Sequence, residues 1–160
     1  MLINTKLDKT WIMAHIPHQG TMCLLDHITD WNTQLVRCNA NSHRHSNNPL
    51  RLNGRLNMAC GIEYAAQAMA VHSALLSYAD NASNSPDIPR SGFLVSVRGA
   101  KLHKTRLDNI EADLDVEATC IHSGGGNTLY QFTLHAAGEL LLDGRAAVMF
   151  NADTQLGISP

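Results

Sequence analysis

With 160 residues, 44% of them hydrophobic, the chain is long enough for a single domain with a sizeable core. Only 16% of its residues are charged and the formal net charge is -2, which excludes wholesale nucleic-acid binding and extended disorder. No apolar run approaches the roughly 18 residues of a membrane span. Residues 1–9 lack the apolar stretch of a secretory signal, so a cytoplasmic protein is expected.

The chain begins with a short amphipathic helix. It is predicted over residues 8–16, ends at Pro17, and is expected to pack onto the body within an N-terminal cap of residues 1–20. Two strand-like runs and then a polar loop follow, over residues 23–31, 35–40 and 42–54.

A long helix is predicted over residues 56–79, where apolar side chains from Ile62 to Leu76 recur with the helical period. Alanine is frequent in this stretch, and small side chains let other elements approach a helix closely. A curved sheet wrapped around the helix is therefore expected, rather than a helix lying on a surface.

The remainder of the chain is typical of antiparallel β-structure. Acidic and apolar residues alternate from Asp113 to Ala118, as in a strand with one solvated face. Gly124–Gly126 is not followed by Gly-Lys-Ser/Thr and predicts a hairpin turn, not a phosphate-binding loop. An α+β domain is predicted, with a strand meander over residues 91–151 and strands at 92–103, 111–122, 129–137 and 140–150. The glycine breaks predict that the last three of these strands pair as an antiparallel meander.

Glu63 is the most informative residue, because it is a carboxylate within the apolar helix. Burial without a partner is costly for a carboxylate, and it raises the pKa toward the range of a general acid/base. Gln67, one helical turn later, shares its face and can hold the carboxylate, while Ala66 and Ala70 leave room beside the pair. Two simpler interpretations stay open: Glu63 faces solvent, or both side chains bind strand backbone.

Unpaired backbone amides at the start of the helix could polarise the carbonyl oxygen of a bound acyl group. An acid/base beside such a dipole suits removal of a proton α to a carbonyl. The expected donors are the backbone amides of Met58, Ala59 and Cys60.

A cluster of cations near the end of a strand could meet an acidic protein or a phosphate, or could be a solvated strand end. It consists of Lys101, Lys104 and Arg106.

No metal site is expected. His15 and His18, like His43 and His45, are spaced as half-sites, but neither pair has an acidic or cysteine ligand at a helical partner position. The four cysteines show no Cys-x-x-Cys pairing and are expected to be reduced core residues.

Three motifs resemble those of a known family. They are Gly61-Ile-Glu-Tyr-Ala-Ala-Gln-Ala-Met-Ala70, Ile16-Pro-His-Gln-Gly-Thr-Met-Cys-Leu-Leu-Asp26 and Asn48-Pro-Leu-Arg51. The first two resemble the hotdog-fold 3-hydroxyacyl-[acyl-carrier-protein] dehydratases, and the third is similar to the subgroup associated with aryl-polyene and related lipid gene clusters. The resemblance implies a single hotdog domain over residues 1–160.

The resemblance places the family's catalytic carboxylate on Glu63 and its supporting amide on Gln67. The family's Gly-His-Phe-Pro motif is absent, and the register of its catalytic histidine falls on Pro49. Dehydration needs a second proton-transferring group. His18 is the first candidate and His43, in the loop before the helix, is the second; either could come from another subunit.

The implied protein is a homodimer, a higher hotdog oligomer or a heteromer with another hotdog subunit. It would dehydrate a 3-hydroxyacyl chain on the phosphopantetheine arm of an acyl carrier protein, in fatty-acid-like or polyene biosynthesis, with no cofactor of its own. The arm would pass the cation cluster. Two alternatives are a hotdog thioesterase, in which Glu63 activates a water, and a non-catalytic hotdog subunit that pairs with an active dehydratase.

Overall fold

The computed structural model describes residues 6–80 and 92–150. Its helices are α1 (Lys9–His15) and α2 (Gly61–Asp80), with short 3₁₀ turns at Gly20–Met22, Ser42–Arg44 and Met58–Cys60. Its strands are β1 (His27–Trp31), β2 (Leu35–Ala40), β3 (Gly92–Leu102), β4 (Leu114–Gly124), β5 (Asn127–Ala136) and β6 (Glu139–Phe150).

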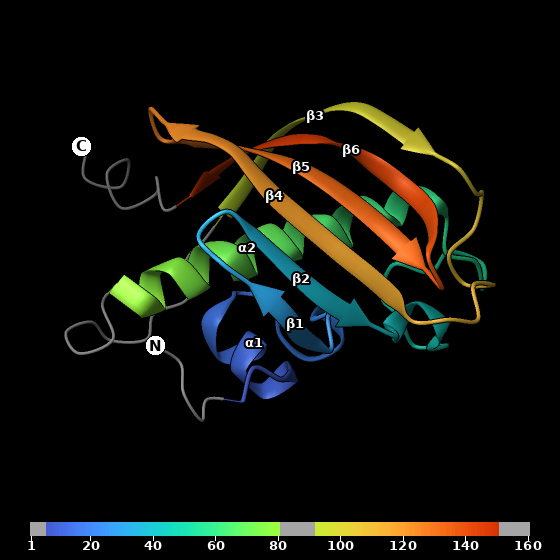
Figure 1. Cartoon of the computed structure of the whole chain (residues 1–160). Helices are drawn as coiled ribbons and strands as arrows, with labels where there is room; N and C mark the ends of the chain where they lie inside the picture. Colours follow the sequence, from blue (N-terminus) through green and yellow to red (C-terminus); the bar gives the residue numbers. More distant parts are fainter. Residues whose placement is uncertain (1–5, 81–91, 151–160) are drawn as a thin grey trace, which may run out of the picture.

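The six strands form one antiparallel sheet in the order β1-β2-β4-β5-β6-β3, which curves over α2 (Figure 1). This arrangement confirms the expected helix wrapped by an antiparallel sheet. The C-terminal strands are not one continuous meander, however. β4, β5 and β6 pair in sequence, which confirms the predicted meander of the last three strands. β3, however, pairs with β6 and occupies the sheet edge. Residues 91 and 151, the ends of the predicted range, lie outside the described residues.

The central helix starts later than its apolar pattern predicts. Residues 58–60 form a 3₁₀ turn and the α-helix begins at Gly61. Leu56 instead takes part in backbone pairing, since its carbonyl accepts a hydrogen bond from the amide of Leu107 at 2.8 Å. At Gly61 the helix approaches the sheet so closely that a Cβ atom would lie 2.7 Å from Leu142 and 2.9 Å from Leu134.

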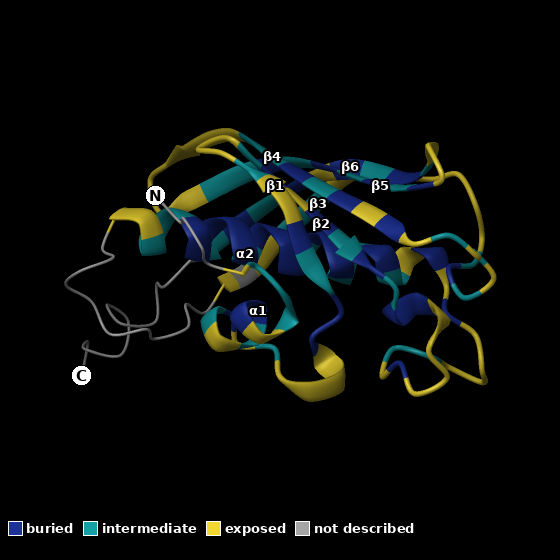
Figure 2. Ribbon diagram, turned by 60° about the horizontal axis from the view of Figure 1, so that its bottom comes forward, coloured by how far each residue is buried: buried dark blue, intermediate teal, exposed yellow. Residues whose placement is uncertain are grey.

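The N-terminal segment covers the side of α2 that the sheet leaves open. Asp8 caps α1 by accepting a hydrogen bond from the amide of Trp11, and the helix ends before Pro17. Figure 2 shows α1 and the following loops as a layer beside α2, and Trp11 and Ile12 are buried there. This layer brings the residues after α1 next to the first turns of α2.

Strand β1 begins at His27 rather than at residue 23. Residues 23–25 of the preceding segment are buried, and the backbone of Leu24 is held by side chains instead of a neighbouring strand. The amide of Leu24 donates to Oε1 of Gln67 at 2.9 Å, and its carbonyl accepts from Oγ of Ser42 at 2.7 Å. The path of the chain after His18 is therefore fixed by α2 itself.

All four cysteines carry free thiols. Cys23 and Cys38 are buried, and Cys60 and Cys120 are half-buried. Neither of the two helices in the described part of the chain is long and apolar enough to cross a membrane.

Candidate active site

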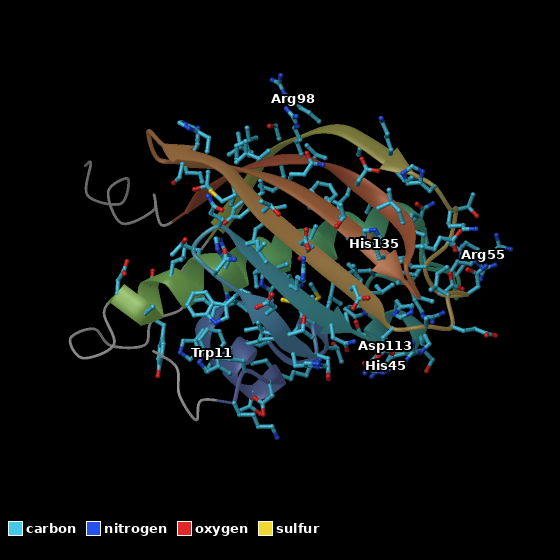
Figure 3. The ribbon with its side chains drawn as sticks, in the orientation of Figure 1. Trp11, His45, Arg55, Arg98, Asp113 and His135 are labelled. Carbon is cyan, nitrogen blue, oxygen red and sulfur yellow. The ribbon has the colours of Figure 1, made fainter. Side chains whose placement is uncertain are left out.

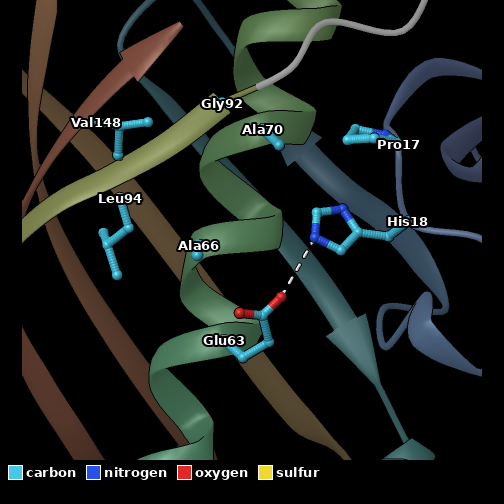
Figure 4. Close-up of a pocket in the computed structure, with 8 residues that line it drawn as sticks. All are labelled: Pro17, His18, Glu63, Ala66, Ala70, Gly92, Leu94 and Val148. Carbon is cyan, nitrogen blue, oxygen red and sulfur yellow. Dashed lines mark ion pairs between the residues drawn. The ribbon is translucent and has the colours of Figure 1, made fainter.

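A cavity of about 120 Å³ lies on the exposed side of α2 (Figure 4). Its walls come from the segment after α1, from one face of α2, and from strands β3 and β6 at the sheet edge. It is lined by Pro17, His18, Glu63, Ala66, Ala70, Gly92, Leu94 and Val148. The alanines expected to leave room beside Glu63 thus form one wall of the cavity.

His18 and Glu63 meet in this cavity. Nε2 of His18 lies 3.3 Å from Oε1 of Glu63, and the two side chains are 27% and 36% exposed. The turn after α1 supplies the histidine and the first turn of α2 supplies the carboxylate. A substrate in the cavity can therefore reach both groups, which share a hydrogen bond when it is absent.

The Glu63 carboxyl has a lowered pKa, contrary to the expectation that burial would raise it. The hydrogen bond with His18 has the largest effect and favours the ionised form, and the hydrogen bond from Gln67 adds to it. Partial burial acts in the opposite direction and is outweighed. Glu63 is therefore ionised near neutral pH and is suited to accept a proton.

Gln67 connects the carboxylate to the histidine-bearing segment. Its side chain is fully buried, and Nε2 donates to Oε1 of Glu63 at 3.2 Å. The same amide group donates to the carbonyl of Met22 at 2.8 Å and accepts from the amide of Leu24 at 2.9 Å. Gln67 is therefore a positioning residue for both halves of the site.

The amides at the helix start are not free, which corrects the expectation that they would hold a carbonyl oxygen. The amide of Met58 donates to the carbonyl of Thr105 at 3.0 Å. Those of Ala59 and Cys60 donate to Oδ1 and the carbonyl oxygen of Asn57 at 2.8 and 2.9 Å. Asparagine is a preferred N-cap residue, so Asn57 was the signal in the sequence that these donors would be occupied.

The structure places His43 away from the cavity lining. It is fully buried, and its Nε2 lies 3.0 and 3.1 Å from the carbonyl oxygens of Ile110 and Ala112. Burial lowers its pKa. His43 therefore ties the loop before the helix to the segment before β4. Across residues 6–80 and 92–150, no three His, Cys, Asp or Glu side chains gather in a group that could hold a metal ion.

Two of the three cations expected to dock a partner are paired within the chain. Nζ of Lys104 lies 3.2 Å from Glu139, and the guanidinium of Arg106 binds Asp108 and holds the pKa of that carboxyl well below its usual range. Lys101 is exposed on β3. Much of the charge of this cluster is therefore already balanced.

Solved structures establish the fold class. The chain superposes on a chain of the dehydratase heterocomplex ApeI:P from Xenorhabdus doucetiae with a TM-score of 0.78 and 20% identity, covering 91% of this chain and 93% of that one. A mutant of the thioesterase PA1618 from Pseudomonas aeruginosa gives 0.53 and 12%, covering 78% and 80%. A mutant of the protein SAV0944 from Staphylococcus aureus gives 0.54 and 14%, covering 77% and 90%. No curated protein matches.

The long helix, the wrapping sheet and these matches define a hotdog-fold protein, with a carboxylate–histidine pair beside the helix. The sequence model of the ApeP-like family, described as ApeP dehydratase, matches residues 11–157. The chain belongs to the ApeP-like dehydratase family, which confirms the resemblance seen in its motifs.

Proposed function

We propose that this protein removes water from a 3-hydroxyacyl thioester carried on the phosphopantetheine arm of an acyl carrier protein. The contact of 3.3 Å between His18 and Glu63 in an open cavity is the observation that supports this most strongly. It supplies the second proton-transferring group that the missing Gly-His-Phe-Pro motif would otherwise provide. Membership of a dehydratase family supports the same reaction.

The two groups divide the proton transfers between them. The ionised carboxylate of Glu63 accepts the proton from C2 of the acyl chain as the C2–H bond breaks. His18 donates a proton from Nε2 to the hydroxyl on C3, the C3–O bond breaks, and water leaves as the C2=C3 double bond forms. The direct contact then lets the proton on Glu63 return to His18 for the next turnover.

The cavity walls suit an acyl chain. Ala66 and Ala70 present small apolar side chains along one helix face beyond Glu63, and Leu94 and Val148 face them from the sheet (Figure 4). An extended acyl chain along this face would hold its C2 and C3 atoms beside His18 and Glu63 without displacing a large side chain.

A second hotdog subunit would complete the site. β3 is an edge strand that pairs on one side only among residues 6–80 and 92–150, and it exposes 43% of Leu94 and 54% of Val95. Such an edge is a template for pairing with another strand. Since Leu94 also lines the cavity, a partner bound at β3 would lie against the substrate. The similar solved structure is itself a heterocomplex, so the partner is either a second copy or a different hotdog chain.

A thioesterase is the second candidate, because an ionised Glu63 could also activate a water toward the thioester carbonyl. The purified protein should be given 3-hydroxyacyl and saturated acyl carrier protein, and each carrier species followed by mass spectrometry. We expect loss of one water from the first and no change in the second. Release of free acid from the second would favour the thioesterase, and no change in either would favour a non-catalytic subunit.

A further inference from the structure

A rigid hairpin lies just before the start of α2. Leu52 and Arg55 exchange two backbone hydrogen bonds, of 2.8 and 3.0 Å, around a tight turn in which Asn53 and Gly54 both have positive φ. The guanidinium of Arg51 donates to the carbonyls of His45, Gly54 and His43 at 2.8, 2.8 and 3.2 Å. This clamp fixes the hairpin in one shape before any partner arrives.

The hairpin presents an apolar side chain and a cation together. Leu52 is 75% exposed, more than any other large hydrophobic residue in the described part of the chain. Arg55 is exposed, and no carboxylate of residues 6–80 or 92–150 forms an ion pair with it. Lys104 and Arg106, by contrast, are balanced by acids. The preorganised turn therefore offers a solvated leucine and an unbalanced guanidinium side by side, which suits a partner with an apolar contact and a negative charge.

The hairpin lies at the end of the molecule where α2 begins. Asn57, two residues after Arg55, forms a backbone bridge with Arg106 and caps the turn that leads into α2, whose first turn carries Glu63. Figure 3 shows Arg55 projecting beyond the end of the molecule at which α2 begins. A protein bound here would therefore stand at the end of α2 that carries Glu63 and not at the far end of the helix.

We propose that the Leu52–Arg55 hairpin is the docking point for the acyl carrier protein, an inference that rests on the proposed dehydratase function. A carrier presents a phosphodiester at the root of its phosphopantetheine arm, so anionic charge lies at the face that it brings to an enzyme. Arg55 provides the complementary charge and Leu52 the apolar contact. This assigns docking to the hairpin instead of the cluster of Lys101, Lys104 and Arg106, in which two of the three cations are paired with acids.

The test compares one acyl chain in two forms, attached to holo-carrier protein and attached to free pantetheine. For Arg55→Glu and Leu52→Ser, kcat/KM on the carrier-bound substrate should fall about 10- to 100-fold, mainly through KM. Activity on the pantetheine thioester should be unchanged. Arg145→Glu and Ile121→Ser are matched controls, because these residues are exposed on the sheet, away from the hairpin, and should behave as wild type on both substrates.

Carrier affinity, measured separately by titrating labelled holo-carrier, distinguishes failure of this proposal from failure of the proposed function. The wild type could bind the carrier but dehydrate neither substrate, and Arg55→Glu could weaken that binding about tenfold. This result would support the docking proposal and contradict the proposed dehydratase function. Three results would each overturn the docking proposal. The first is an equal loss of kcat/KM on both substrates, and the second is unchanged kinetics and affinity for the carrier. The third is a change in the mass of the assembly without a change in carrier affinity.

Discussion

Gln67 donates a hydrogen bond to Oε1 of Glu63 at 3.2 Å, and that same oxygen lies 3.3 Å from Nε2 of His18. One carboxylate oxygen therefore faces two side chains, while the other is free of both in this arrangement. Gln67 is fully buried and also holds the backbone of Met22 and Leu24. The geometry of the His18–Glu63 pair thus depends on a residue outside the cavity lining.

Replacing Gln67 with leucine should impair both stability and catalysis. The change keeps the volume but leaves the buried amide of Leu24 without its acceptor, which should cost about 1–3 kcal/mol of unfolding free energy. Without the hydrogen bond from Gln67, the carboxylate of Glu63 is no longer held in place. We therefore expect kcat on a pantetheine thioester to fall about tenfold. Denaturant unfolding and steady-state kinetics measure the two effects.

Gln131→Leu is the matched control, because Gln131 is half-buried on β5 and accepts only a long hydrogen bond of 3.4 Å from Arg145. Gln67→Leu with wild-type stability and wild-type kcat would show that Gln67 does not position the site.

The Glu63–Gln67 pair was predictable because helical spacing is local: residues four apart share a face whatever surrounds them. Its neighbour His18 could be proposed only as a candidate, since the contact depends on how the segment after α1 folds back onto α2. The occupied helix-start amides depend partly on the carbonyl of Thr105, which no local pattern reveals. The edge position of β3 was missed for the same reason, because it is set by pairing with β6, the last strand.

Removing His18 should raise the pKa of Glu63. That pKa now lies below the ordinary value of 4.5, chiefly because of the hydrogen bond with His18. In His18→Gln the carboxyl should titrate at higher pH, which an NMR titration of a labelled Glu63 side chain would report. Identical titration in wild type and variant would contradict the assigned cause.

The same shift predicts how stability depends on pH. A carboxyl with a lowered pKa in the folded state stabilises the protein fully above its unfolded pKa, and this stabilisation is lost as pH falls through the folded value. The contribution of Glu63 should therefore be complete above about pH 4.5 and should be lost progressively as pH falls below that value. Denaturant unfolding of wild type and His18→Gln should show their stability difference narrowing in that acid window, and a difference that widens there would be the wrong sign.

Gly144→Ala should destabilise the fold. A Cβ at Gly144 would lie 2.8 Å from the ring of Phe132 and 3.2 Å from the backbone of Ala100, so the buried ring or strand β3 would have to move. Overpacking of this kind costs about 1–3 kcal/mol. Gly124→Ala is the control, because the nearest atom to its Cβ would be 3.6 Å away, in ordinary contact. Equal stability of the two variants in denaturant unfolding would contradict this packing.

Val95→Lys should prevent assembly through β3. A lysine at an edge strand opposes pairing with another strand, since its charge would have to leave water. Light scattering should give the mass of one chain for the variant and a larger mass for the wild type or its mixed complex. Ile121→Lys, at a residue 47% exposed on the internal strand β4, should leave the mass unchanged. If Val95→Lys kept the wild-type mass, the interface would have to lie elsewhere.

The joint action of His18 and Glu63 is tested most directly by kcat for Glu63→Gln, His18→Gln and the double variant, on one 3-hydroxyacyl pantetheine thioester that needs no carrier docking. Each single change should lower kcat by about 100- to 10,000-fold. The double variant should fall little further, because groups that act as one unit are strongly non-additive. If kcat of the double variant fell by the product of the two single decreases, His18 and Glu63 would not act as one unit. Undiminished dehydration by Glu63→Gln would also contradict their joint action.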